Sequence, residues 1–113
     1  MTNPKRGELT LKLGQKNLKA RVTLDSILKM ETALDKSIMQ IAQSLSNGHL
    51  KITEQIAILL PVIRAGSNDV SEKEVGEMVY QAGIADTLKA IGEVVTIVMS
   101  AGQDEGNVQE AVE

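Results

Sequence analysis

Two short stretches near the start of the chain alternate strictly between apolar and polar residues. They cover residues 8–13 and 18–23 and are joined by Gly14-Gln15-Lys16-Asn17, a connection with turn-forming residues at both ends. A period of two is typical of half-buried strands, and the connection favours a β-hairpin. The apolar positions, which fall on one face, are Leu9, Leu11, Leu13, Leu18, Ala20 and Val22.

An isolated two-stranded sheet is marginal in water, so this apolar face must pack on the rest of the chain. Residues 24–100 show helical rather than strand periodicity. We therefore expect an α+β fold, mostly α, in which the hairpin (about 8–23) packs on a bundle of four to five helices (about 24–100). With 113 residues, a single domain over residues 1–101 is expected.

Capping residues indicate where these helices begin and end. Thr23 or Asp25 can cap the first helix, and residues 35–37 predict a break after it. Asn47-Gly48 is typical of a helix end, and Thr53 is the expected N-cap of a third helix.

The third helix is apolar on every side over residues 56–63, which predicts a central, buried position. Pro61 lies inside it and should kink or break it, because proline cannot donate to the carbonyl of Ala57. Residues 71–74 form a capping box that begins a fourth helix, and Gly83 ends it.

The last helix is expected over residues 84–100, followed by an acidic tail over 102–113 that we expect to be disordered. Gly76 and Gly92 lie inside predicted helices, where we expect them to allow close packing.

The composition excludes several classes of function. Tyr80 is the only aromatic residue, and the chain has no cysteine and one histidine, His49. These counts argue against a disulfide framework, a thiolate nucleophile, a multi-histidine metal site and a base-stacking module. The acidic spacing matches no calcium loop, and His49 is expected in an exposed loop. We predict a protein that is not an enzyme and has no catalytic residues, cofactor or metal.

The charge is unevenly distributed along the chain. Residues 1–21 hold six basic residues and one acidic residue, a net charge of +5, whereas the remainder carries −8. A basic amino end can attract phosphates or an acidic protein surface, but lysines also keep an edge strand soluble. No apolar run approaches the roughly 20 residues of a membrane span, and we expect a cytoplasmic protein.

Methionines at helical spacing fill cores in most proteins, yet adaptable binding grooves over-use them. With the apolar hairpin face and the single aromatic residue, they give a predicted protein-interaction set. Its members are Leu9, Leu11, Leu13, Leu18, Met30, Met39, Met78 and Tyr80.

The order of the elements, with several short motifs, resembles a family of small tail proteins encoded in gene transfer agents and siphophage-like tail clusters. The motifs are Pro4-Lys5-Arg6-Gly7-Glu8, the segments 22–31 and 33–37, Ala65-Gly66 and the segment 75–79. The resemblance covers roughly residues 3–100. Asp35 stands where that family commonly has a glycine.

Members of that family have been described both as tail tube proteins and as tail assembly chaperones. The resemblance implies binding to the tape-measure protein, a long, largely helical chain, and to other tail proteins during tail morphogenesis in a bacterial host. A tube subunit needs a β-rich structure, so the helical pattern favours the chaperone role. The alternatives are a structural subunit retained in the particle and a nucleic-acid-associated regulator that uses the basic amino end. The hairpin edge is the expected site of homo-oligomerisation.

Overall fold

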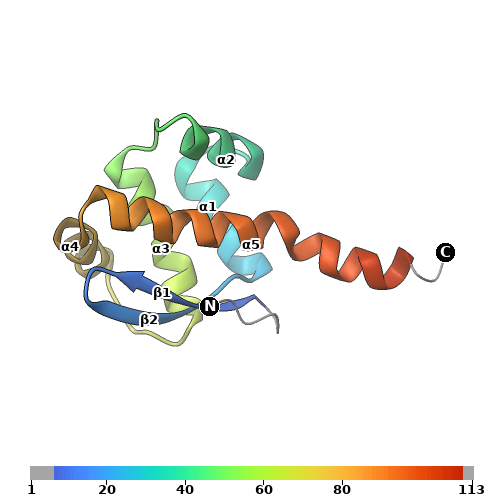
Figure 1. Cartoon of the computed structure of the whole chain (residues 1–113), viewed down its shortest axis with the longest axis horizontal. Coiled ribbons are helices and arrows are strands. Elements are labelled where there is room, and N and C mark those ends of the chain that lie inside the picture. The colour runs from blue at the N-terminus through green and yellow to red at the C-terminus, as the bar shows by residue number, and fades with distance from the viewer. Residues whose placement is uncertain (1–6, 111–113) are drawn as a thin grey trace.

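The described chain consists of an antiparallel hairpin followed by five helices, which confirms the predicted α+β, mostly helical fold (Figure 1). This computed structural model describes the backbone of residues 7–110 and the side chains of residues 7–100. The elements in order are β1 (Glu8–Leu13), β2 (Lys16–Arg21), α1 (Leu24–Leu34), α2 (Ile38–Ser46), α3 (Ile52–Ala65), α4 (Glu72–Ala82) and α5 (Ile84–Glu110).

The hairpin turn is tighter than the sequence predicts. Leu13 pairs with Lys16, so only Gly14 and Gln15 form the loop, and β2 begins two residues earlier than expected. Gly14 has a φ of 63°, whereas Gln15 is not among the residues with positive φ. A positive φ at the first central position alone is the requirement of a type II′ turn, which matches the twist of the flanking strands.

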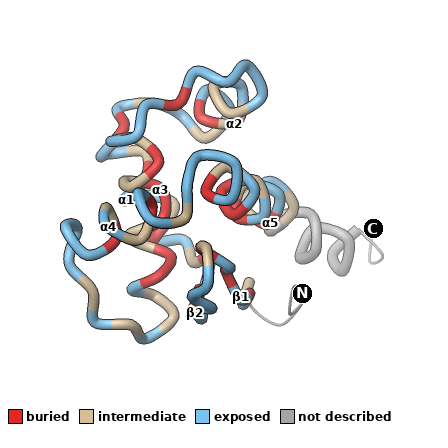
Figure 2. Tube along the Cα trace, turned by 60° about the vertical axis from the view of Figure 1, so that its left-hand side comes forward, coloured by how far each residue is buried: buried red, intermediate tan, exposed pale blue. Residues whose placement is uncertain are grey.

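One face of the hairpin is buried against helices, as the alternation predicts. Leu9, Leu11 and Leu13 of β1 and Ala20 of β2 are at most 5% exposed. β1 contacts α5 and α4, while β2 contacts α3. Figure 2 shows the buried stretches where these elements meet. The strands therefore close one side of the helical core.

The break between α1 and α2 is confirmed, and its conformation explains the residue found there. Thr23 caps α1 reciprocally with Ser26, through hydrogen bonds of 3.0 and 2.8 Å. α1 ends at Leu34, and its C-cap Asp35 has a φ of 54°, which lies in the left-handed region. Glycine adopts this conformation without strain, and aspartate is one of the few other residues that tolerate it.

α3 differs from the prediction in two respects. It begins at Ile52 with Lys51 as the N-cap, because the Glu54 carboxylate accepts a hydrogen bond from the Lys51 amide at 2.9 Å; the predicted Thr53 cap is wrong. The helix is also not broken at Pro61 but continues to Ala65. Tight packing on one side of the helix explains this continuity: Leu60 and Pro61 are half-buried, but four nearby side chains are 0% exposed, those of Ile58, Leu59, Val62 and Ile63.

The segment after α3 fastens that helix to β2. Gly66 lies so close to β2 that an added Cβ would stand 2.7 Å from the Cα of Ala20 and nearer still to the carbonyl of Lys19. The Asn68 side-chain amide donates to the carbonyl oxygens of Lys19, at 2.6 Å, and Ile63, at 3.1 Å. Strand, helix end and loop are thus joined at one point.

The predicted capping box at the start of α4 is confirmed: Ser71 and Glu74 exchange hydrogen bonds of 3.1 and 2.7 Å. Gly83, with a φ of 88°, separates α4 from α5. A Cβ on Gly76 would lie 3.3 Å from Ile56 Cδ1, which agrees with close packing of α4 on α3. Gly92 has no such neighbour within 4 Å, so the packing role predicted for it is wrong.

α5 continues well beyond the predicted end at residue 100. Its backbone is helical through Glu110, within the segment expected to be a disordered tail. The side chains of residues 101–110 and all of residues 111–113 lie outside the described part. In Figure 1 this end of α5 projects away from the hairpin and the other helices.

Candidate protein-interaction site

A groove of about 460 Å³ lies between α1, α3 and α4. Its apolar lining comes mainly from α3, and none of these side chains is fully buried. Partly exposed aliphatic surface of this kind is suited to an apolar side chain of a partner. The apolar lining residues are Ala33, Ile56, Ala57, Leu60, Pro61 and Ala65.

Pro61 gives the groove an unusual polar feature. Because proline has no N–H, the carbonyl of Ala57, one turn earlier in α3, lacks its intrahelical donor. Both residues line the groove. On the uncovered side of α3, the carbonyl oxygen of Ala57 therefore needs water or a partner as its hydrogen-bond donor.

Charged residues occupy the rim. Asp25 and Lys29 of α1 form an ion pair at 2.9 Å, with both side chains well exposed. Arg64 donates from Nε to the carbonyl of Val70 at 2.9 Å, and Glu72 lies at the start of α4. Equal numbers of positive and negative groups give the rim no net charge, so the lining rather than the rim determines which partners fit.

A half-buried ion pair joins the loop after α1 to the start of α3, and so fixes two walls of the groove relative to each other. Lys36 Nζ lies 2.9 Å from Glu54 Oε2 and 3.5 Å from Ser44 Oγ. The hydrogen bond from Lys36 is the main cause that lowers the pKa of Glu54 below its usual value of 4.5, and the Lys51 amide adds to it. Partial burial opposes this shift.

The lowered pKa predicts how acid affects stability. A carboxyl whose pKa is depressed on folding contributes stability that is complete above its unfolded pKa and is lost as pH falls through the folded pKa. We expect Glu54→Gln to reduce the free energy of unfolding by about 1 kcal/mol at pH 7. The difference from the original protein should shrink once pH falls below about 4.5.

Urea unfolding at pH 7 and at acid pH measures both quantities. Asp25→Asn is the matched control, since it removes a carboxylate from the exposed ion pair and should have almost no effect. A Glu54→Gln deficit that stays constant through the acid range would contradict the assigned role.

The predicted interaction residues fall into two groups. Leu9, Leu11, Leu13 and Met30 belong to the core, whereas Met39 and Tyr80 are 58% and 84% exposed. Leu18 and Met78 are half-buried. None of the eight lines the groove. Whether they contact a partner stays a prediction, but only the exposed members have side chains available without a change in packing.

The sequence analysis missed two exposed aliphatic residues that are next in sequence to residues lining the groove. Leu24 and Leu28, four residues apart on α1, are 71% and 51% exposed. Residues with this spacing share one face of a helix. That face neighbours the α1 side carrying Asp25 and Lys29, which line the groove. Their exposure had no sequence signal, because leucine at helical spacing is equally typical of a core.

The β2 edge of the hairpin is covered by the rest of the chain, whereas the β1 edge is open within residues 7–100. The Val22 amide donates a hydrogen bond to the Gly7 carbonyl, and hydrogen-bonded pairs alternate with non-hydrogen-bonded pairs along an antiparallel ladder. In this register Thr10 and Lys19 form a non-hydrogen-bonded pair, so their backbone groups point outward, away from the partner strand. Lys19 is engaged by Asn68, so the β2 edge is covered. Within residues 7–100, no hydrogen bond engages the outward backbone groups of Thr10 or Lys12 on β1.

The described part of the chain contains no cluster of three or more acidic, histidine or cysteine side chains that could hold a metal ion. His49 is exposed in the loop after α2, as expected. None of the described helices is both long enough and apolar enough to cross a bilayer.

The fold is that of a small α+β domain in which helices pack on a β-hairpin. Its exposed aliphatic groove is a surface suited to binding another protein. The chain belongs to a family of phage tail proteins, described as "Phage tail tube protein, GTA-gp10", whose model matches residues 6–101. This confirms the resemblance to gene transfer agent tail proteins. Searches of curated proteins and of solved structures give no match.

Proposed function

We propose that this protein is a non-enzymatic tail assembly chaperone that binds the tape-measure protein during tail morphogenesis. Membership of the phage tail family supports a role among tail proteins. The single observation that carries the chaperone role is the apolar groove between α1, α3 and α4, which suits an amphipathic helix of a largely helical partner. Such a protein would act in the bacterial cytoplasm, where tails assemble.

The small amount of strand structure argues in the same direction. A subunit that builds a tube wall from sheets needs several strands, and the described residues supply one hairpin of two six-residue strands. Helices form the rest of the described fold. A chaperone requires only a stable body and an exposed apolar surface.

Co-expression with a fragment of the tape-measure protein tests the proposal. The original chain should keep the fragment soluble and copurify with it. Ala33→Glu, which places a charge in the groove, should reduce recovery about tenfold or more, the effect of roughly 1.4 kcal/mol. Thr32→Glu is the matched control, because the neighbouring residue is exposed on the same helix and does not line the groove.

Equal recovery with both variants would reject the groove as the binding site, and an insoluble fragment with no complex would reject the chaperone role. The alternative, a structural subunit retained in the particle, has its own measurement. Mass spectrometry of purified particles should find little or none of a chaperone, whereas a structural subunit would be present in fixed stoichiometry.

Homo-oligomerisation through the hairpin edge remains part of the proposal. The support is the open edge of β1, where Thr10 presents an outward amide and carbonyl. Thr10→Pro removes this outward donor without removing a bond to β2, so it tests edge pairing selectively. Light scattering should show a lower mass for Thr10→Pro if the edge joins two copies.

A further inference from the structure

The outward face of the hairpin carries more basic than acidic side chains, with Lys12, Lys19 and Arg21 against Glu8. β1 contributes Lys12 and β2 contributes Lys19, both exposed, and the same face carries Glu8 opposite Arg21. The pairing register places Lys12 opposite Asn17 and Lys19 opposite Thr10. Among residues 7–100, neither of these lysines has an ion-pair partner.

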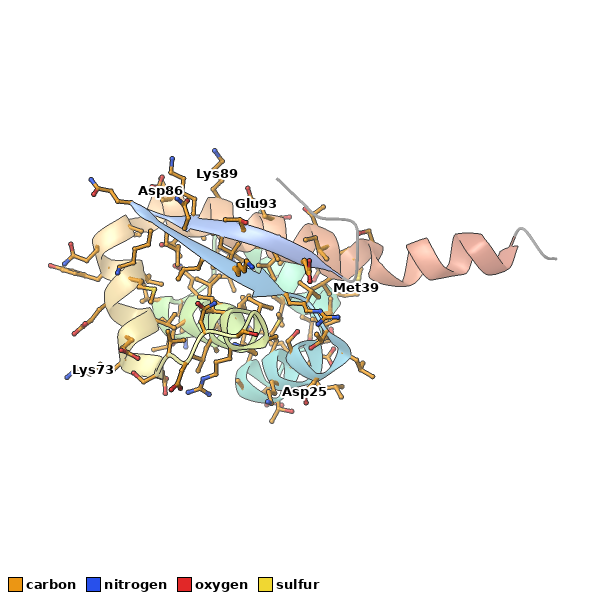
Figure 3. The ribbon with its side chains drawn as sticks, turned by 90° about the horizontal axis from the view of Figure 1, so that it is seen from below. Asp25, Met39, Lys73, Asp86, Lys89 and Glu93 are labelled. Carbon is orange, nitrogen blue, oxygen red and sulfur yellow. The ribbon has the colours of Figure 1, made fainter. Side chains whose placement is uncertain are left out.

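Lys12 and Lys19 are also diagonal neighbours on one face of the sheet, with backbones roughly 7–8 Å apart, and Glu8 is the diagonal neighbour of Lys19 on its other side. Ammonium groups that share a face repel each other, and an anion placed between them relieves that repulsion. The face thus has the chemistry of a site for a carboxylate-rich segment. In Figure 3 it lies toward the viewer, with no helix in front of the two strands.

The chain itself holds a segment of the complementary charge. Residues 102–113 contain four acidic residues, Asp104, Glu105, Glu110 and Glu113, and no basic residue. The backbone of α5 carries residues 102–110 away from the hairpin of its own copy (Figure 1). From Ser100 to Glu110 the helix advances about 15 Å, so its end lies well clear of the hairpin of the same copy.

We propose that the acidic end of α5 from one copy binds the basic hairpin face of the next, so that copies associate head to tail. Such a contact joins two different surfaces and leaves one of each free at the ends of an assembly. Copies joined in this way either close into a ring or extend as a line. Both arrangements are compatible with assembly of a tail, which is built of repeating units. The groove takes no part in this contact.

Charge reversal tests the contact on the full chain. Sedimentation or light scattering at about 50 mM salt should show self-association that weakens at about 500 mM, because screening shortens the range of the attraction. The hairpin variant Lys12→Glu/Lys19→Glu and the tail variant Asp104→Lys/Glu105→Lys should each weaken association about tenfold or more. An equimolar mixture of the two variants should associate again, since each supplies the charge that the other needs.

The matched control is Lys73→Glu/Lys89→Glu, which makes the same change in charge on α4 and α5. Figure 3 shows both side chains pointing outward, clear of the two strands. This control should associate like the original protein, and thermal unfolding should show that all variants are folded. Recovery of the tape-measure fragment should be unaffected by the hairpin variant, which separates a failure of this proposal from a failure of the groove.

Several results would overturn the proposal: a monomer at low salt, association indifferent to both reversals, or a mixture that fails to restore it. Association abolished by Thr10→Pro and independent of salt would assign the contact to the strand edge. A short DNA duplex that binds the original protein with strong salt dependence, but not the hairpin variant, while the protein stays monomeric, would assign the face to nucleic acid.

Discussion

Gly66→Ala is expected to destabilise the domain by about 3 kcal/mol, the upper part of the range for overpacking a tight contact. The added Cβ would meet backbone atoms of β2, 2.7 Å from the Cα of Ala20, and backbone cannot move aside as the end of a flexible side chain can. Relief would require α3 and β2 to separate. Urea unfolding should show a lower midpoint with an unchanged slope.

Gly92→Ala provides the opposite case in the same chain. Gly92 lies within α5, and a Cβ there would meet no atom within 4 Å. Alanine should therefore stabilise the helix by about 0.5–1 kcal/mol. If Gly66→Ala proved neutral while Gly92→Ala behaved as expected, the close approach of α3 to β2 would be incorrect.

Leu11→Ala should cost about 3–5 kcal/mol, in the range of leucine truncations in close-packed cores. The side chain is 0% exposed, on the strand that packs against α5 and α4. A small domain is stable by only about 5–15 kcal/mol, so the variant should be close to unfolding at physiological temperature. Because a hairpin is marginal alone, amides of both strands should lose protection from hydrogen exchange together.

Thr10→Val is the control for this loss. It changes the neighbouring residue, on the exposed face of the same strand, to another β-branched side chain. Its effect should remain within about 0.5 kcal/mol, as for most surface substitutions. Comparable losses for the two variants would mean that the orientation of β1 is reversed.

Local rules predicted the parts of the fold that depend on local contacts. The alternation of the hairpin, the caps at Thr23 and Ser71 and the helix end at Asn47-Gly48 all depend on residues near in sequence. The errors occur where distant contacts decide. Pro61 breaks an isolated helix, but the packed environment of α3 keeps the helix continuous.

The candidate site was less accessible to prediction. A helix that is apolar on every side does not tell which side the rest of the chain leaves uncovered, so the groove beside α3 had no signal. Methionine gave no guidance either, since Met30 is buried at 1% exposure and Met39 is 58% exposed with the same side chain. Tyr80 was chosen because of its rarity, and its 84% exposure makes it available to a partner.

The contact between β1 and α5 joins the first strand of the chain to its last helix. A ribosome therefore releases the hairpin long before the surface on which it packs exists. At roughly 5–20 residues per second, the leucines of β1 stay uncovered for several seconds. The core closes only once α5 has been synthesised, so chains interrupted before α5 cannot reach the native state and leave an apolar strand exposed to solvent.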